Sequence, residues 1–233
     1  MAEDIVPGLI DAIQADFKKS YEGNSAIARV ARLVDEGTAT YKEVNDYATW
    51  MGQLLSAAIK RNVTADALPD GRMYYNIAER IMNTTLKDDH DLIVTMAENV
   101  QANLNRQAGI GIKAIKPAYN TSRADGIIER LSNEADFNKI KWILDEPIVN
   151  FHEAIVDAAI KSNAEFHAAS GIPAVVHRIT SGKCCDWCDN LAGKYTYPDV
   201  PDDIYRRHDY CRCTVEYDPG EGKKQNVWSK RWR

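Results

Sequence analysis

Apolar residues recur at helical spacing through most of this chain, three or four positions apart. Such spacing places the apolar side chains on one face of a helix, and that face is buried against other helices. The segments with this spacing are 3–21, 25–37, 40–60, 74–86, 89–108 and 147–169. Gly, Pro, Asn and Thr residues at most of their junctions are typical helix ends and turns. The pattern therefore predicts a bundle of amphipathic helices.

The helical spacing is interrupted at residues 108–117. Small or polar residues alternate there with isoleucines, and Pro117 cannot occupy the interior of a helix. We expect an extended connector or a short strand in this segment. Helical patterns resume after Thr121 and again from Asp136.

No recognisable set of catalytic side chains occurs in the helical region. His90 lies among aspartates, which favours a solvated helix start because acidic side chains interact well with the amino end of a helix. His152 and His167 lie about four helical turns apart, too far to share one metal ion, and we expect each to be a partly buried structural histidine. Trp142 and Phe166 are expected to face the core.

Beyond residue 171 the pattern becomes that of strands. Residues 174–180 are rich in β-branched side chains, and shorter stretches of similar character follow at 191–197 and 214–217. We therefore predict an α+β fold: a mainly α-helical N-terminal body with a small C-terminal β-rich module. The expected parts are a helical scaffold or docking region at 1–171, the β module at 172–219 and a basic tail at 220–233.

Composition and charge exclude several classes of protein to which this chain could belong. Hydrophobic residues make up 45% and charged residues 27% of the 233 residues, which excludes a largely disordered chain. The net charge of −5 excludes a protein whose whole surface binds nucleic acid electrostatically. Neither a signal peptide nor an apolar run of about 20 residues is present, so we expect a cytosolic protein without a membrane segment.

All five cysteines lie near the C-terminal end, at positions 184, 185, 188, 211 and 213. An odd number in a reducing compartment argues against a disulfide framework. Cys185 and Cys188 form a C-x-x-C pair, which brings two thiolates to one point, and soft ligands from a distant segment then complete a tetrahedron around zinc. Buried unreactive thiols, a redox-active pair and late disulfides are alternatives that the clustering favours less.

The second pair of ligands is ambiguous, because His208, Cys211 and Cys213 offer three ligands for two positions. Cys211 and Cys213 share a face if they lie on a strand, and His208 with Cys211 is spaced like a short turn. Since the protein ligands number four or more, the coordination shell closes, which predicts one structural Zn²⁺ per chain rather than a catalytic ion. Cys184 fits no such set.

The motifs around these ligands resemble a known family. The run 176–180 (Val-His-Arg-Ile-Thr), the C-x-x-C pair, the Leu-Ala-Gly at 191–193 and the terminal H-x-x-C-R-C at 208–213 are similar to the C-terminal signature of phage Mu F-like minor head, or head-morphogenesis, proteins. The specific resemblance covers about residues 155–217.

This resemblance implies a protein of a phage or prophage, made in the bacterial cytoplasm and located in the virion head. It implies a structural, non-enzymatic role in procapsid assembly or genome delivery, through contacts with the portal protein, the major capsid protein or both. No small-molecule substrate is expected.

Two further hypotheses concern the C-terminal end. The tail combines basic residues with Trp228 and Trp232, which suits docking on a neighbouring subunit, weak contact with DNA, or no role at all. A rival to the assembly role is a small metal-dependent nuclease or effector, in which His177, His208 or Glu216 polarises a water near the metal.

Overall fold

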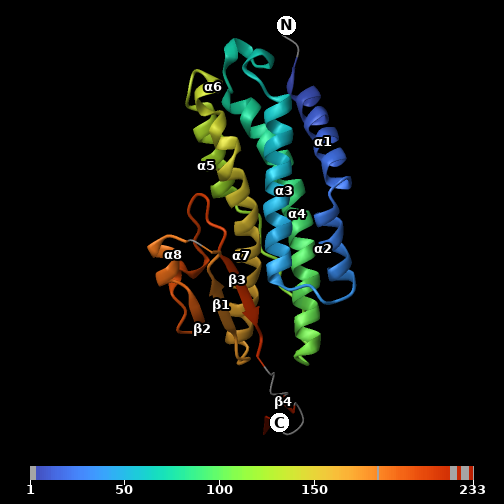
Figure 1. Cartoon of the computed structure of the whole chain (residues 1–233), viewed down its shortest axis with the longest axis vertical. Coiled ribbons are helices and arrows are strands. Elements are labelled where there is room, and N and C mark those ends of the chain that lie inside the picture. The colour runs from blue at the N-terminus through green and yellow to red at the C-terminus, as the bar shows by residue number, and fades with distance from the viewer. Residues whose placement is uncertain (1–3, 183, 221–224, 227–230, 233) are drawn as a thin grey trace.

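A computed structural model describes residues 4–182 and 184–220, and the backbone of residues 225–226 and 231–232. The chain is mostly helical with a small antiparallel sheet near its C-terminal end, as predicted (Figure 1). The helices are α1 (Val6–Glu22), α2 (Ser25–Asp35), α3 (Tyr41–Asn62), α4 (Tyr75–Gln107), α5 (Thr121–Ser132), α6 (Phe137–Ile140), α7 (Glu146–Ala169) and α8 (Asp186–Asn190). Short 3₁₀ turns are η1 (Ala65–Ala67), η2 (Pro69–Gly71), η3 (Lys141–Leu144) and η4 (Asp202–Tyr205). The strands are β1 (Val175–Ile179), β2 (Gly193–Thr196), β3 (Thr214–Asp218), β4 (Gln225–Asn226) and β5 (Arg231–Trp232).

Helices α3 and α7 form the centre of the bundle and lie side by side, with α1 and α4 packed around α3 (Figure 1). Their approach is closest at Gly52, where an added Cβ atom would lie 2.8 Å from the Cα atom of Val149. Glycine is required here because any side chain would push the two helices apart. None of the described helices combines the length and the apolarity needed to cross a bilayer.

Helix α4 corrects one prediction. The two segments 74–86 and 89–108 form a single helix, because no glycine or proline interrupts the chain between them. His90 therefore lies inside a helix and is 6% exposed, so the prediction of a solvated helix start was wrong. Its ring packs edge-on against Tyr119, with 5.4 Å between the ring centroids.

The connector after α4 has no regular secondary structure, so residues 110–120 form neither a helix nor the short strand that was one of the two expectations. The side chain of Asn163 on α7 accepts a hydrogen bond from the backbone nitrogen of Ile115 (2.8 Å) and donates one to the oxygen of the same residue (2.9 Å). This amide satisfies both backbone groups of Ile115 without a neighbouring strand.

The histidines of α7 are structural and more deeply buried than predicted, since His152 and His167 are both 0% exposed. His152 contacts the oxygen of Ile148 through Nδ1 (2.7 Å) and Asp89 on α4 through Nε2 (2.8 Å). His167 hydrogen-bonds through Nδ1 to the hydroxyl of Tyr217 on β3. The two side chains therefore connect α7 to α4 and to β3 by hydrogen bonds.

Two aromatic residues expected in the core are exposed instead. Phe166 is 41% exposed, because the neighbouring His167 takes the position that faces β3. Trp142 is 49% exposed and its ring lies beneath the guanidinium of Arg130, 5.0 Å from the ring centroid. This cation–π contact stabilises the tryptophan ring at the surface.

The three-stranded sheet has the order β2-β1-β3, with all pairs antiparallel. Its inner face carries Val176, Val215 and Tyr217, which belong to the same continuous core as the helices. Strand β3 packs against α3 and α7 (Figure 1).

Candidate metal centre

Two tight turns present the predicted metal ligands. Cys185 precedes the first residue of α8 and Cys188 lies within this single-turn helix. His208 and Cys211 lie on the loop between η4 and β3, where the nitrogen of Cys211 donates a hydrogen bond to the oxygen of His208 (3.1 Å). Each turn curls the chain so that two ligands point the same way.

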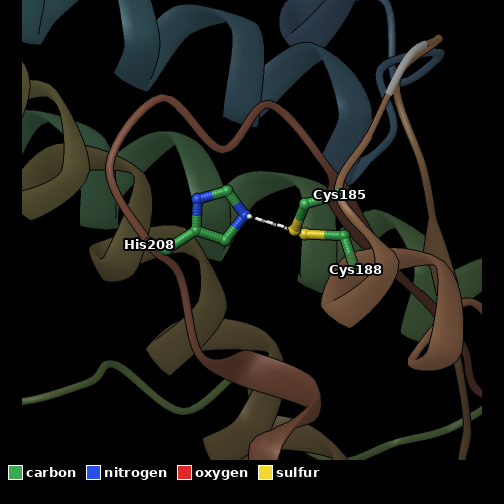
Figure 2. A group of neighbouring side chains, drawn as sticks. All are labelled: Cys185, Cys188 and His208. Carbon is green, nitrogen blue, oxygen red and sulfur yellow. Dashed lines mark hydrogen bonds between the residues drawn. The ribbon is translucent and has the colours of Figure 1, made fainter.

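The imidazole of His208 points at the C-x-x-C pair (Figure 2). Its Nε2 atom lies 3.3 Å from the sulfur of Cys185 and 3.1 Å from that of Cys188, and the sulfurs of Cys188 and Cys211 are 3.7 Å apart. Tetrahedral zinc with its usual bond lengths separates two thiolates by about 3.8 Å, and a thiolate from an imidazole nitrogen by about 3.5 Å. The sulfur-to-sulfur distance lies near the first of these separations, and both nitrogen-to-sulfur distances are shorter than the second.

All five predicted ligands meet at this place, in two groups that share Cys188. The ligand atoms of Cys185, Cys188 and His208 lie within 4.8 Å of one another, and so do those of Cys188, Cys211 and Cys213. These groups are close enough to hold a metal ion. No carboxylate of the described residues belongs to either group. Cys184 stays outside both, and its sulfur contacts Asp189 Oδ1 at 3.8 Å.

The ring orientation of His208 suits metal binding. Its Nδ1 atom lies 2.7 Å from the backbone oxygen of Asp209. A carbonyl oxygen only accepts hydrogen bonds, so Nδ1 carries the proton and Nε2 keeps a free electron pair. A histidine ligand held in this way by a backbone carbonyl is common in metal sites.

The thiols differ in their environment. Backbone N–H groups of α8, that of Cys188 first, hold the pKa of the exposed Cys185 thiol below its usual value. Burial raises the pKa of Cys188 to about 12, and burial also raises the pKa of Cys213. A metal ion that binds the buried sulfurs must therefore displace protons from them.

Arg178, on β1, is a neighbour of the thiols that the sequence showed only as part of the run 176–180. It is 2% exposed, and its Nη2 atom lies 3.8 Å from the sulfur of Cys188 and 3.7 Å from that of Cys211. Nη1 donates to the backbone oxygen of Ile204, and the ring of Trp187 lies 5.4 Å from the guanidinium carbon.

Arg207 attaches this ligand-bearing loop to the helices. Its side chain is 1% exposed and contacts both oxygens of Asp157, with Glu153 at 3.1 Å and Asn45 at 2.7 Å. Although burial alone would lower it, the pKa of Arg207 is raised because the two carboxylates stabilise its charge. The guanidinium also donates to the oxygen of Cys213 (2.9 Å).

Arg212, between two of the cysteines, provides a second attachment. Its guanidinium makes a two-pronged contact with Glu146 at the start of α7, at 2.6 and 3.0 Å. The same carboxylate accepts a hydrogen bond from the nitrogen of Tyr210 (2.9 Å). The loop is therefore fixed to α7 at two separate points.

The spacing of the acidic residues of α7 is the sequence signal for these attachments. Glu146, Glu153 and Asp157 are spaced so that they fall on one face of α7, a helix predicted to bury an apolar face. Buried carboxylates require buried cations. Their positions indicated that basic side chains from elsewhere in the chain would reach this face.

Of the three residues of the nuclease hypothesis, His208 belongs to the ligand cluster, whereas His177 and Glu216 lie away from it. His177 lies opposite Glu216 in the register of β1 and β3, but neighbouring residues of a strand point to opposite faces. Because Arg178 faces the thiols, His177 and Glu216 lie on the other face of the sheet. The side chains of the basic tail, with Trp228 and Trp232, lie outside the described residues, so its proposed contacts remain predictions.

Comparison with known proteins gives no relative: no family model, no curated protein and no solved structure matches this chain.

Proposed function

We propose that the cysteine and histidine residues of the β module bind one structural Zn²⁺ ion. The observation that carries this proposal is the convergence of two distant turns on one point, with Nε2 of His208 3.1 Å from the sulfur of Cys188. Thiolates and imidazole are ligands that zinc prefers, and the distance between the sulfurs of Cys188 and Cys211 is near the separation of two thiolates on one zinc ion.

A structural role is favoured over a catalytic role by the supply of ligands. Catalytic zinc keeps one position for water, usually beside a carboxylate that acts as a base. Here the protein offers at least four soft ligands, and no carboxylate of the described residues belongs to either ligand group. Zinc binding can contribute on the order of 10 kcal/mol to the folding of a small module.

We further propose that the chain is a phage or prophage minor head protein of the Mu F-like type. The support is the terminal H-x-x-C-R-C motif at 208–213, in which each defined position has a structural use. His208, Cys211 and Cys213 belong to the ligand cluster, and Arg212 holds the motif on α7. In this role the protein acts in head assembly or genome delivery by binding the portal or the major capsid protein.

Metal analysis tests the zinc site. Elemental mass spectrometry of the purified, reduced protein is expected to find one zinc ion per chain. Cys188→Ser should lose the metal, and Cys184→Ser, which changes a thiol outside the cluster, should retain it. A metal-free wild-type protein whose residues 175–218 still resist hydrogen exchange would overturn the zinc proposal.

Co-expression tests the assembly role. The chain should co-purify with the portal or the major capsid protein encoded in the same genome, and Cys188→Ser should weaken this capture. A nuclease would behave differently: metal-dependent DNA cleavage that His208→Ala abolishes in a folded protein would contradict the non-enzymatic role. Failure to bind either head protein would contradict the proposed partners.

A further inference from the structure

The guanidinium of Arg178 is buried, and no described residue provides it with a partner of opposite charge. Among the described residues, no carboxylate oxygen lies within 4.0 Å of it, although Arg207 and Arg212 nearby have such partners. A buried charge without compensation is strongly destabilising, so a stable fold should supply a negative group close by. The atoms next to Nη2 are the sulfurs of Cys188 and Cys211, at 3.8 and 3.7 Å.

A zinc centre provides this negative charge, and the amount depends on the ligands. An ion of charge +2 with three thiolates and one neutral imidazole has a net charge of −1, which one guanidinium balances. Four thiolates would leave −2 beside the single charge of Arg178. Charge balance therefore favours three cysteines and one histidine, and the proton on Nδ1 of His208 leaves its Nε2 ready to bind.

The contacts also distinguish the two late cysteines. The sulfur of Cys211 lies 3.7 Å from that of Cys188, near the separation of two thiolates on one zinc, and it contacts Arg178. Cys213 is equally buried and its sulfur lies in one group with those of Cys188 and Cys211, but within the described part of the chain only Cys211 of the two late cysteines contacts Arg178.

Building on the zinc site proposed above, we infer that the ligands are Cys185, Cys188, His208 and Cys211, that Arg178 balances the charge of this centre, and that Cys213 is a buried thiol outside the coordination shell. Arg178 is thus a positioning residue: it contacts the ligand sulfurs and lowers the electrostatic penalty of burying a negatively charged centre. Loss of such an outer contact typically weakens metal binding about 10- to 100-fold.

Competition with a chromophoric chelator tests the role of Arg178. Arg178→Met, which keeps the apolar stem but removes the charge, is expected to weaken zinc binding about 10- to 100-fold, whereas Arg178→Lys should recover much of the loss. Helix content and hydrogen exchange in α3 and α7 verify that each variant is folded. A folded Arg178→Met protein with wild-type zinc affinity would overturn the charge-balancing role.

Cobalt substitution tests the ligand set, because the sulfur-to-cobalt absorption band grows with the number of bound thiolates. Cys213→Ser should keep the wild-type band and affinity, and Cys211→Ser should lose a thiolate. If Cys213→Ser loses the band while His208→Ala keeps it, the ligands are four cysteines and this assignment is wrong. A wild-type protein that binds neither metal would instead refute the zinc site itself.

Discussion

At the scale of single residues, Arg207 shows how a polar group can belong to a core. Its guanidinium is enclosed by Asp157, Glu153 and Asn45, and its five N–H groups find acceptors on α3, on α7 and in the loop before β3. A buried ionic cluster of this kind contributes little more to folding stability than packed apolar side chains would. Removing the arginine, however, leaves the carboxylates buried without a cation.

Arg207→Met should therefore destabilise the protein by about 3–5 kcal/mol, because Asp157 and Glu153 lose their counter-charge. Urea unfolding followed by circular dichroism measures this change. Arg206→Met is the matched control, since Arg206 pairs with Asp203 at the surface, with side chains 74% and 42% exposed. Its effect should be no more than about 1 kcal/mol. Equal effects of the two substitutions would contradict the buried network.

Gly52 and Gly126 offer a second comparison between matched substitutions. Gly52→Ala should destabilise the protein by about 1–3 kcal/mol, because its Cβ atom would lie 2.8 Å from the backbone of Val149. Gly126→Ala on α5 meets nothing within 4 Å and should stabilise the helix by about 0.5–1 kcal/mol. Thermal unfolding of both variants gives the two signs, and a stabilising Gly52→Ala would refute the close contact of α3 with α7.

At the scale of elements, α7 joins the helical bundle to the β module. It packs on α3 along its length, binds Arg207 and Arg212 through its acidic face, and reaches β3 near its end. The last of these contacts is the hydrogen bond of His167 with Tyr217. Burial lowers the pKa of His167, because the charged imidazolium is less well solvated inside the protein.

This lowered pKa predicts how stability depends on pH. Below about pH 6.5, the usual histidine pKa, the unfolded chain takes up a proton at His167 that the folded chain does not accept. The free energy of unfolding should therefore fall with decreasing pH in the window below that value. The stability difference between wild type and His167→Gln should shrink as the pH drops from 7 to 5, and a difference that grows would contradict the burial of a neutral His167.

Most helices and strands could be predicted from the sequence because the spacing of apolar residues depends on local structure. The β-branched run at 174–180 gave β1, and the helical spacing gave most of the helices, because periodicity reflects which face is buried. The junction inside α4 was misplaced because its polar residues, Lys87 and Asp88, resemble a boundary but lack a helix breaker. Polarity alone does not end a helix.

At the scale of the whole molecule, the helices and the sheet share one core. Val176, Val215 and Tyr217 of the sheet pack in the same cluster as Tyr41 and Phe151 of the helices. The expected boundary near residue 171 thus marks a change from helices to strands. The helices and the sheet on its two sides bury each other's apolar surface.

Truncation of the chain measures how far the stability of the helices depends on the β module. A chain ending at residue 171 should unfold at a markedly lower temperature than the full protein or should aggregate, because its apolar face and the carboxylates of Glu153 and Asp157 lose their cover. A chain ending at residue 220 keeps both and is the control, expected to unfold close to the full-length temperature. A fragment 1–171 as stable as the whole chain would show that the helical body folds independently.

The sequence by itself determined the class of fold and the candidate ligands, since helical spacing, β-branched runs and the C-x-x-C and H-x-x-C-R-C motifs depend only on nearby residues. It left open which of His208, Cys211 and Cys213 completes the site. Only the tertiary structure placed Arg178 against the sulfurs and Arg207 between the carboxylates of α7. These contacts join segments far apart in the chain, and their strength comes from burial, which no local pattern specifies.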